Sequence, residues 1–195
     1  MIARRAALAL VALLALSSCN LAANYLESTE FRVAGSRLLM SGTITSATPR
    51  QFARVLAANP QITTLVERNV DGSVDDAAMI EMGYRLRRAG LDTHLDGDSQ
   101  IFSGAVMLFL SGVERTMIRG AVIGVHSWRD SLRDGADYPA TSPKHALNRR
   151  YVADMLGQDA FYWFTLRAAP SEGMYLLREH EIRDFGLLTR PIEAP

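Results

Sequence analysis

The sequence lacks cysteine pairs, an excess of either charge, and any apolar run long enough to cross a membrane. Cys19 is the only cysteine, so the chain has no intrachain disulfide and no cysteine-based catalytic or metal site. Lysine plus arginine equal aspartate plus glutamate at 21 each, and no basic field therefore points to nucleic acid. The four histidines show no metal-ligand spacing, such as two histidines four residues apart on one helix. We expect neither a metal ion nor another cofactor.

The N-terminus has the pattern of an export signal. Two arginines precede an unbroken apolar run, Ala6–Leu16, which is shorter than the roughly 20 residues that span a bilayer. The following Leu16-Ser17-Ser18-Cys19 resembles the bacterial lipobox, at which the cysteine is lipidated and becomes the first residue of the mature protein. An ordinary signal peptide and an uncleaved membrane anchor are the alternatives, but neither accounts for the position of the lone cysteine.

These features predict three parts of the chain. Residues 1–18 are the signal peptide, residues 19–30 are the lipidated cysteine with a tether, and residues 31–195 are a folded domain with a sizeable core. We expect an exported lipoprotein that faces the periplasm and is held to a membrane through its N-terminal lipid. Asn20, directly after the cysteine, favours the outer membrane.

Apolar segments of strand length alternate with helical patterns along the domain. The strand candidates are residues 37–41, 62–66, 91–95 and 121–125, and the helical candidates are residues 48–58, 73–89, 103–110, 143–156 and 178–184. Strands that alternate with helices are typical of a mostly parallel sheet with right-handed crossovers. The sequence therefore predicts an α/β domain.

Three segments carry the candidate chemistry, each where a strand pattern ends or a helical pattern begins. Ser103 opens an almost wholly apolar helical segment, and a serine held there can act as a nucleophile. His126 closes a strand and is the histidine best placed to act as its base. Gly72, in a predicted Asp71-Gly72-Ser73 turn, and Gly104 can offer unobstructed backbone N–H groups to an oxyanion. This set favours a serine hydrolase.

A catalytic triad also needs a carboxylate that orients the base. Glu172, Asp154 and Asp159 lie downstream of the histidine, and the sequence does not choose among them. The Gly-x-Ser-x-Gly elbow of α/β-hydrolases is absent, because Ile101 and Ala105 occupy its glycine positions. A serine that only caps a helix and a histidine that is only structural therefore remain the alternative.

The order of these motifs resembles that of the Clp protease proteolytic subunit and the wider crotonase-like superfamily. The similarity is greatest to exported bacterial Clp-protease-like proteins and covers about residues 37–189. It rests on Ser41-Gly42 at a strand end, on Asn69–Val74, and on the segments RAGLDT, LFLSGVER, IGVHS and EIRDFGLLT, which begin at residues 88, 108, 123 and 181.

The resemblance implies a Clp-protease-like or crotonase-like fold, with a mostly parallel sheet, repeated ββα units and flanking helices. It implies Ser103 as the nucleophile, His126 as the base, and the N–H groups of Gly72 and Gly104 as the oxyanion hole. The implied substrate is a peptide or protein, and the implied assembly is a homo-oligomer. The chain has no Walker motif, so energy-dependent unfolding of a substrate would need a partner.

Two of the departures from the family bear on the catalytic groups. Asp71 stands where the family has a glycine and would put a carboxylate beside the oxyanion hole, and the catalytic acid aligns near Met174, which makes Glu172 the nearest candidate. Two functions are therefore open: a membrane-tethered serine peptidase or hydrolase, and a catalytically inactive relative that acts as a binding or assembly module. An acyl-CoA enzyme of the crotonase type fits less well, because an exported lipoprotein would not meet coenzyme A.

Overall fold

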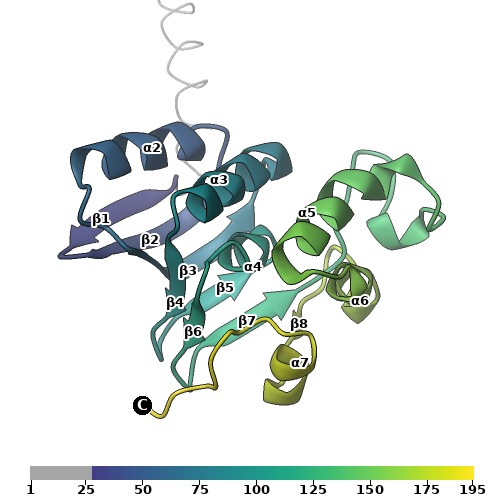
Figure 1. Ribbon diagram of the computed structural model, residues 1–195. Helices are drawn as coiled ribbons and strands as arrows, with labels where there is room; N and C mark the ends of the chain where they lie inside the picture. The colour runs from purple at the N-terminus through teal and green to yellow at the C-terminus, as the bar shows by residue number, and fades with distance from the viewer. Residues whose placement is uncertain (1–27) are drawn as a thin grey trace, which may run out of the picture.

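A computed structural model describes residues 28–195, so the predicted signal peptide, Cys19 and most of the predicted tether lie outside the described residues. Figure 1 shows α2 and α3 along one face of the sheet, with α5 and α6 beyond β7. No helix among residues 28–195 is long and apolar enough to cross a membrane.

The strands are β1 (Glu30–Ala34), β2 (Arg37–Ile44), β3 (Thr64–Ser73), β4 (Asp92–Leu95), β5 (Gln100–Phe102), β6 (Arg115–Met117), β7 (Val122–Val125) and β8 (Tyr175–Leu176). The α-helices are α2 (Thr48–Ala58), α3 (Asp76–Arg88), α4 (Gly104–Phe109), α5 (Ala146–Leu156), α6 (Ala160–Ala168) and α7 (Glu179–Asp184).

The sheet divides along β3, which has different neighbours at its two ends. The first part of β3, Thr64–Val66, pairs with β4, and β4 pairs with β6. Further along, Asn69 and Val70 pair with β5, and β5 pairs with β7. These pairings and that of β2 with β3 are parallel, whereas β1 and β8 are antiparallel edge strands. The predicted α/β fold with a mostly parallel sheet is confirmed.

One face of the sheet is covered by helices and forms the core. In β2, Leu38 and Met40 are fully buried while Leu39 between them is partly exposed, which is the alternation of a strand with one covered face. Phe52 of α2 and Leu86 of α3 are fully buried as well. Each such side chain contributes about 1.5–3 kcal/mol through its removal from water. The core therefore holds the central strands rigidly where they carry the candidate site.

The segment between β3 and α3 differs from its predicted form. The sequence predicts a turn at Asp71-Gly72-Ser73 with Ser73 as the helix cap, but β3 continues through these residues and ends at Ser73. The N-cap of α3 is Asp75, whose carboxylate accepts a hydrogen bond from the N–H of Ala78 at 3.0 Å. Three arginines in the last turn suit the negative end of the helix dipole.

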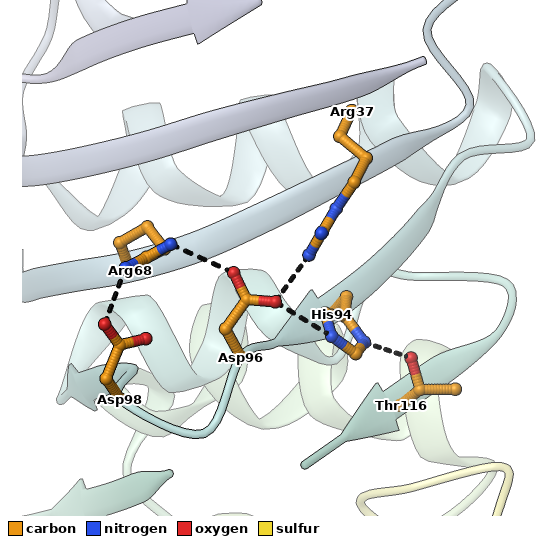
Figure 2. A network of polar contacts seen from close by, with 6 residues as sticks. All are labelled: Arg37, Arg68, His94, Asp96, Asp98 and Thr116. Atoms are coloured by element: carbon orange, nitrogen blue, oxygen red, sulfur yellow. Dashed lines mark hydrogen bonds and ion pairs between the residues drawn. The ribbon is translucent and has the colours of Figure 1, made fainter. Parts of the chain in front are cut away.

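A polar network links β2 and β3 to the branch of the sheet formed by β4 and β6. The Asp96 carboxylate follows β4 and accepts hydrogen bonds from Arg37 of β2 at 2.6 Å and from Arg68 of β3 at 3.1 Å (Figure 2). His94 lies between this carboxylate, 3.3 Å from its Nε2, and the Thr116 hydroxyl of β6, 2.7 Å from its Nδ1. Burial, together with the charge of Arg37, lowers the pKa of His94. Both ring nitrogens of His94 thus have partners within the sheet.

Glu67 of β3 is fully buried on the core side of the sheet. Neither of its carboxyl oxygens has a hydrogen-bond partner among the described residues. Burial raises the pKa of Glu67 well above its usual range, because a charged carboxylate would lose its hydration there without gaining a partner. Glu67 is therefore a neutral acid in the folded protein over a range of pH in which the unfolded chain has already lost that proton.

We predict that Glu67→Gln makes the stability of the protein less dependent on pH. The folded state keeps the Glu67 proton to a higher pH than the unfolded chain, so the free energy of unfolding falls as the pH rises from the unfolded pKa of about 4.3 toward the raised folded pKa. This group contributes a slope of up to about 1.4 kcal/mol per pH unit, which the variant lacks. Urea unfolding at a series of pH values measures both slopes, and equal slopes would contradict the prediction.

Candidate active site

The carboxyl ends of three neighbouring strands bring the predicted segments together. Ser103 directly follows β5, and His126 directly follows β7, which is the parallel neighbour of β5. Gly72 lies near the end of β3, which borders β5 on the other side. Parallel strands end at the same edge of a sheet, and ligands of open α/β sheets bind outside that edge. These three residues, 54 positions apart from first to last, therefore meet at one place.

Ser103 has a strained backbone and a free hydroxyl. Its φ of 53° makes it the only non-glycine with a positive φ among residues 28–195. It is the N-cap of α4 but makes no side-chain capping hydrogen bond, and its N–H is held by the Gly124 carbonyl at 2.9 Å. A strained serine on a sharp turn from strand to helix is the geometry of a nucleophile elbow, although the glycines of that motif are absent.

Two glycines pack against this serine. A β-carbon on Gly72, whose φ is +126°, would lie 3.1 Å from Cβ of Ser103 and 3.5 Å from the backbone nitrogen of Gly104. A β-carbon on Gly104 would lie 2.8 Å from Cβ of Ser73, so Gly104 has no room for a side chain and Gly72 has little. Asp71 is exposed while Gly72 is buried, because neighbouring residues of a strand face opposite ways. The Asp71 carboxylate thus points away from the predicted oxyanion hole.

His126 is held by a backbone carbonyl. Its Nδ1 lies 2.7 Å from the carbonyl oxygen of Ser127. A carbonyl oxygen only accepts hydrogen bonds, so this contact places the proton of a neutral imidazole on Nδ1 and leaves a lone pair on Nε2. His126 and Ser103 line one cavity, but no hydrogen bond joins them in the described part of the chain. Hydrogen bonds between catalytic groups are often long without substrate and shorten when it binds.

None of the three predicted carboxylates reaches this cavity. Glu172 is 83% exposed and pairs with Arg129 at 2.9 Å on the surface. Asp154 accepts a hydrogen bond from the Tyr84 hydroxyl, and Asp159 lies near the start of α6. The structure therefore brings the serine, the histidine and the two glycines together, and leaves the predicted acid outside.

Met174 lies where the resemblance places the catalytic acid. β8 runs antiparallel to β7 with Tyr175 opposite Val125, so Met174 comes next to His126 in the continued register. Its sulfur packs over Gly124, where a β-carbon would lie 2.8 Å from it. A thioether carries no charge that would stabilise an imidazolium. The Ser127 carbonyl is thus the group that orients the histidine here.

The cavity beside Ser103 and His126 has a volume of about 50 Å³ and contains two polar residues that the sequence did not indicate. Asp76 opens α3, and its carboxylate accepts hydrogen bonds from the Ser73 hydroxyl at 2.8 Å and from the Asn148 side chain at 3.0 Å. An acid in the first turn of a helix normally indicates only a favourable dipole interaction. Asn148 is 72 residues away on α5, so no local pattern signals the pair.

The aromatic side chains of Trp128 and Tyr162 also line the cavity. The Trp128 indole N–H donates a hydrogen bond to the Tyr162 oxygen at 2.9 Å, and Nδ1 of the buried His145 lies 2.6 Å from the same oxygen. The predicted aromatic run is part of α6, where Phe161 and Tyr162 are buried in the core. Residues 28–195 contain no group of three or more histidine, cysteine or acidic side chains that could hold a metal ion.

Comparison with known proteins shows the fold. No protein-family model matches the sequence, and no curated protein sequence matches it either. Among solved structures, the chain is similar to the crystal structure of an enoyl-CoA hydratase from Polaromonas sp. JS666, with a TM-score of 0.52 and 11% sequence identity over 85% of this chain and 71% of the hydratase. The chain thus has a crotonase-like fold, and at this identity the similarity extends to the fold alone.

We predict that Gly72→Ala lowers stability more than an alanine at another left-handed glycine. Gly157 is the control, because its φ of +76° lies close to the left-handed region that alanine can enter and its β-carbon would meet nothing within 4 Å. The control should lose about 1 kcal/mol from backbone strain, and Gly72→Ala about 3 kcal/mol because its φ of +126° is less accessible to alanine and crowding against Ser103 adds to the strain. Urea unfolding measures both, and equal losses would show that Gly72 does not press on the serine.

Proposed function

We propose that this protein is a serine hydrolase, of the peptidase type, that forms an acyl-enzyme on Ser103. The observation that carries the proposal is the conformation of Ser103: a strained turn exposes a hydroxyl that does not cap its helix, in a cavity shared with His126. A serine that only capped α4 would accept a hydrogen bond from the first turn and would need no positive φ. Strain of this kind persists where the surrounding structure imposes it, and it clusters at active sites.

The proposed reaction begins when Oγ of Ser103 attacks the carbonyl carbon of the substrate. Nε2 of His126 takes the hydroxyl proton, and the carbonyl electron pair moves to the oxygen, which becomes an oxyanion. The N–H groups of Gly72 and Gly104 stabilise that oxyanion. Collapse of the intermediate expels the leaving group, which takes the proton from His126, and water then releases the acyl group by the same steps in reverse.

In this proposal a carbonyl replaces the carboxylate of the usual triad. The Nδ1–H donated to Ser127 keeps the lone pair on Nε2, which is the tautomer that a general base needs. A neutral carbonyl stabilises the imidazolium that forms during the reaction less than a carboxylate does. Serine hydrolases keep part of their rate enhancement without the full triad. We therefore expect a slow enzyme.

The proposal includes the setting predicted from the N-terminus. The lipid on Cys19 would hold the domain at the periplasmic face of a membrane, and the substrate would be a peptide or protein there. Several copies would assemble, as in the family that the sequence resembles. Under this proposal coenzyme A esters are not substrates, because export separates the enzyme from them.

The competing proposal is a binding or assembly module without catalysis. It is favoured by Met174 beside His126 and by the surface position of Glu172. With this arrangement the site lacks the catalytic acid of the family that the sequence resembles. The two proposals differ in one property: only an enzyme needs the Ser103 oxygen to be nucleophilic.

We predict that the full chain reacts with a fluorophosphonate probe at Ser103, whose Oγ displaces fluoride from phosphorus. Intact mass should show one adduct, which Ser103→Ala abolishes and which His126→Ala slows by about 10²-fold or more through loss of the general base. Ser111→Ala is the control, because Ser111 is a buried serine whose hydroxyl bonds to the Leu108 carbonyl. A folded protein that forms no adduct, or forms it equally in the Ser103→Ala variant, would favour the binding module.

A further inference from the structure

The cavity next to Ser103 contains a negative charge without a cation. The Asp76 carboxylate is partly buried, and both of its hydrogen bonds come from neutral groups, the Ser73 hydroxyl and the Asn148 amide. Among residues 28–195, no lysine, arginine or histidine forms an ion pair with it. A carboxylate that is partly removed from water is more stable when a cation lies beside it. None of the described residues supplies one within ion-pair distance.

A hydrogen-bond acceptor beside Asp76 lacks a donor among residues 28–195. Oδ1 of Asn148 is buried and accepts no hydrogen bond from any described residue, while Nδ2 of the same amide is committed to Asp76. A buried acceptor of this kind normally has a donor. The acceptor and the carboxylate belong to side chains that line one cavity, and both call for N–H groups from a ligand.

The walls of the cavity suit a cation. Trp128 and Tyr162 present aromatic surface, and aromatic rings attract ammonium and guanidinium groups. Burial raises the pKa of Tyr162 to about 12; the hydrogen bond from Trp128 and the charge of Arg149 oppose that rise, and the charge of Asp76 adds to it. A volume of about 50 Å³ admits a small head group rather than a large ring system.

We infer that this cavity binds a small cationic group of the substrate, an alkylammonium or guanidinium, with Asp76 as its counter-ion and Asn148 as a second acceptor. The inference rests on the proposed function in calling this group part of the substrate, since it places the group beside the Ser103 nucleophile. Asp76 is then a specificity-determining residue and takes no part in the bond-making steps. The preferred substrates carry a basic group near the bond that is cleaved.

The test uses binding, so that it does not depend on catalysis. The full chain with Ser103→Ala is titrated with n-propylammonium and with 1-propanol, which is a neutral molecule of similar size. The side-chain amide resonance of Asn148 in a 1H–15N spectrum reports on the cavity directly. We expect saturable shifts with n-propylammonium and none with 1-propanol over the same concentrations.

Two variants, each lacking one negative charge, distinguish the effect of the Asp76 carboxylate from that of the neighbouring Asp75. Asp76→Asn keeps both hydrogen bonds, because the free Oδ1 of Asn148 can accept from the new amide when Asn148 turns over, and it should weaken n-propylammonium binding about tenfold or more. Asp75→Asn keeps the helix cap, since asparagine caps as well as aspartate, and should bind as before. Both would be checked for folding by thermal unfolding.

The possible outcomes are distinct. Equal shifts with the ammonium and the alcohol, or equal weakening by the two variants, would overturn the inference; the ammonium–alcohol comparison decides it even when Asp76→Asn does not fold. Selective ammonium binding in a protein that never forms a fluorophosphonate adduct would support the cation site while the proposed hydrolase fails. An adduct on Ser103 without selective ammonium binding would leave the hydrolase standing and remove the cation site.

Discussion

The close contact between Gly72 and Ser103 is the constraint on which the candidate site depends. β5 has three residues, and the chain must leave it, turn and begin the buried helix α4 within one residue. Ser103 takes the strain of that turn, with a positive φ, and Gly72 leaves room for it by having no side chain. The hydroxyl is exposed as a consequence. The packing of the core thus offsets the strain of one residue in an unfavourable conformation at the edge of the sheet.

The chemistry of the site follows from what surrounds this strained residue. On the β7 side, His126 is oriented by a neutral carbonyl and has Met174 for a neighbour. On the α3 side, Asp76 places a negative charge within the same cavity. In the function that we propose, the same edge of the sheet separates two tasks: the ends of β5 and β7 hold the reacting groups, while the starts of α3 and α5 recognise the substrate.

The fold and much of the site could be predicted because both depend on local patterns. Apolar strands alternate with helical segments, and Ser103, His126, Gly72 and Gly104 each stand at a junction between them. The features that the sequence does not predict depend on contacts between residues far apart in the chain or on very short elements. β5 is too short to show a period, and the Asp71-Gly72-Ser73 segment has turn residues but is held as a strand by pairing with β2. The cavity residues Asp76 and Asn148 meet only because α5 lies against α3 in the folded chain. Glu172 is the carboxylate closest in sequence to the family position, but its side chain lies on the surface and pairs with Arg129.

The most direct test of this account is the crystal structure of the protein after reaction with a fluorophosphonate. The account predicts a tetrahedral phosphorus on Oγ of Ser103, with one phosphonyl oxygen about 2.7–3.1 Å from the backbone nitrogens of Gly72 and Gly104. Nε2 of His126 should lie near the phosphorus-bound oxygen on the side away from the phosphonyl oxygen. A phosphonyl oxygen that points into solvent, away from both glycines, or an adduct on a different residue, would contradict the claim that the strained turn at Ser103 builds a catalytic site.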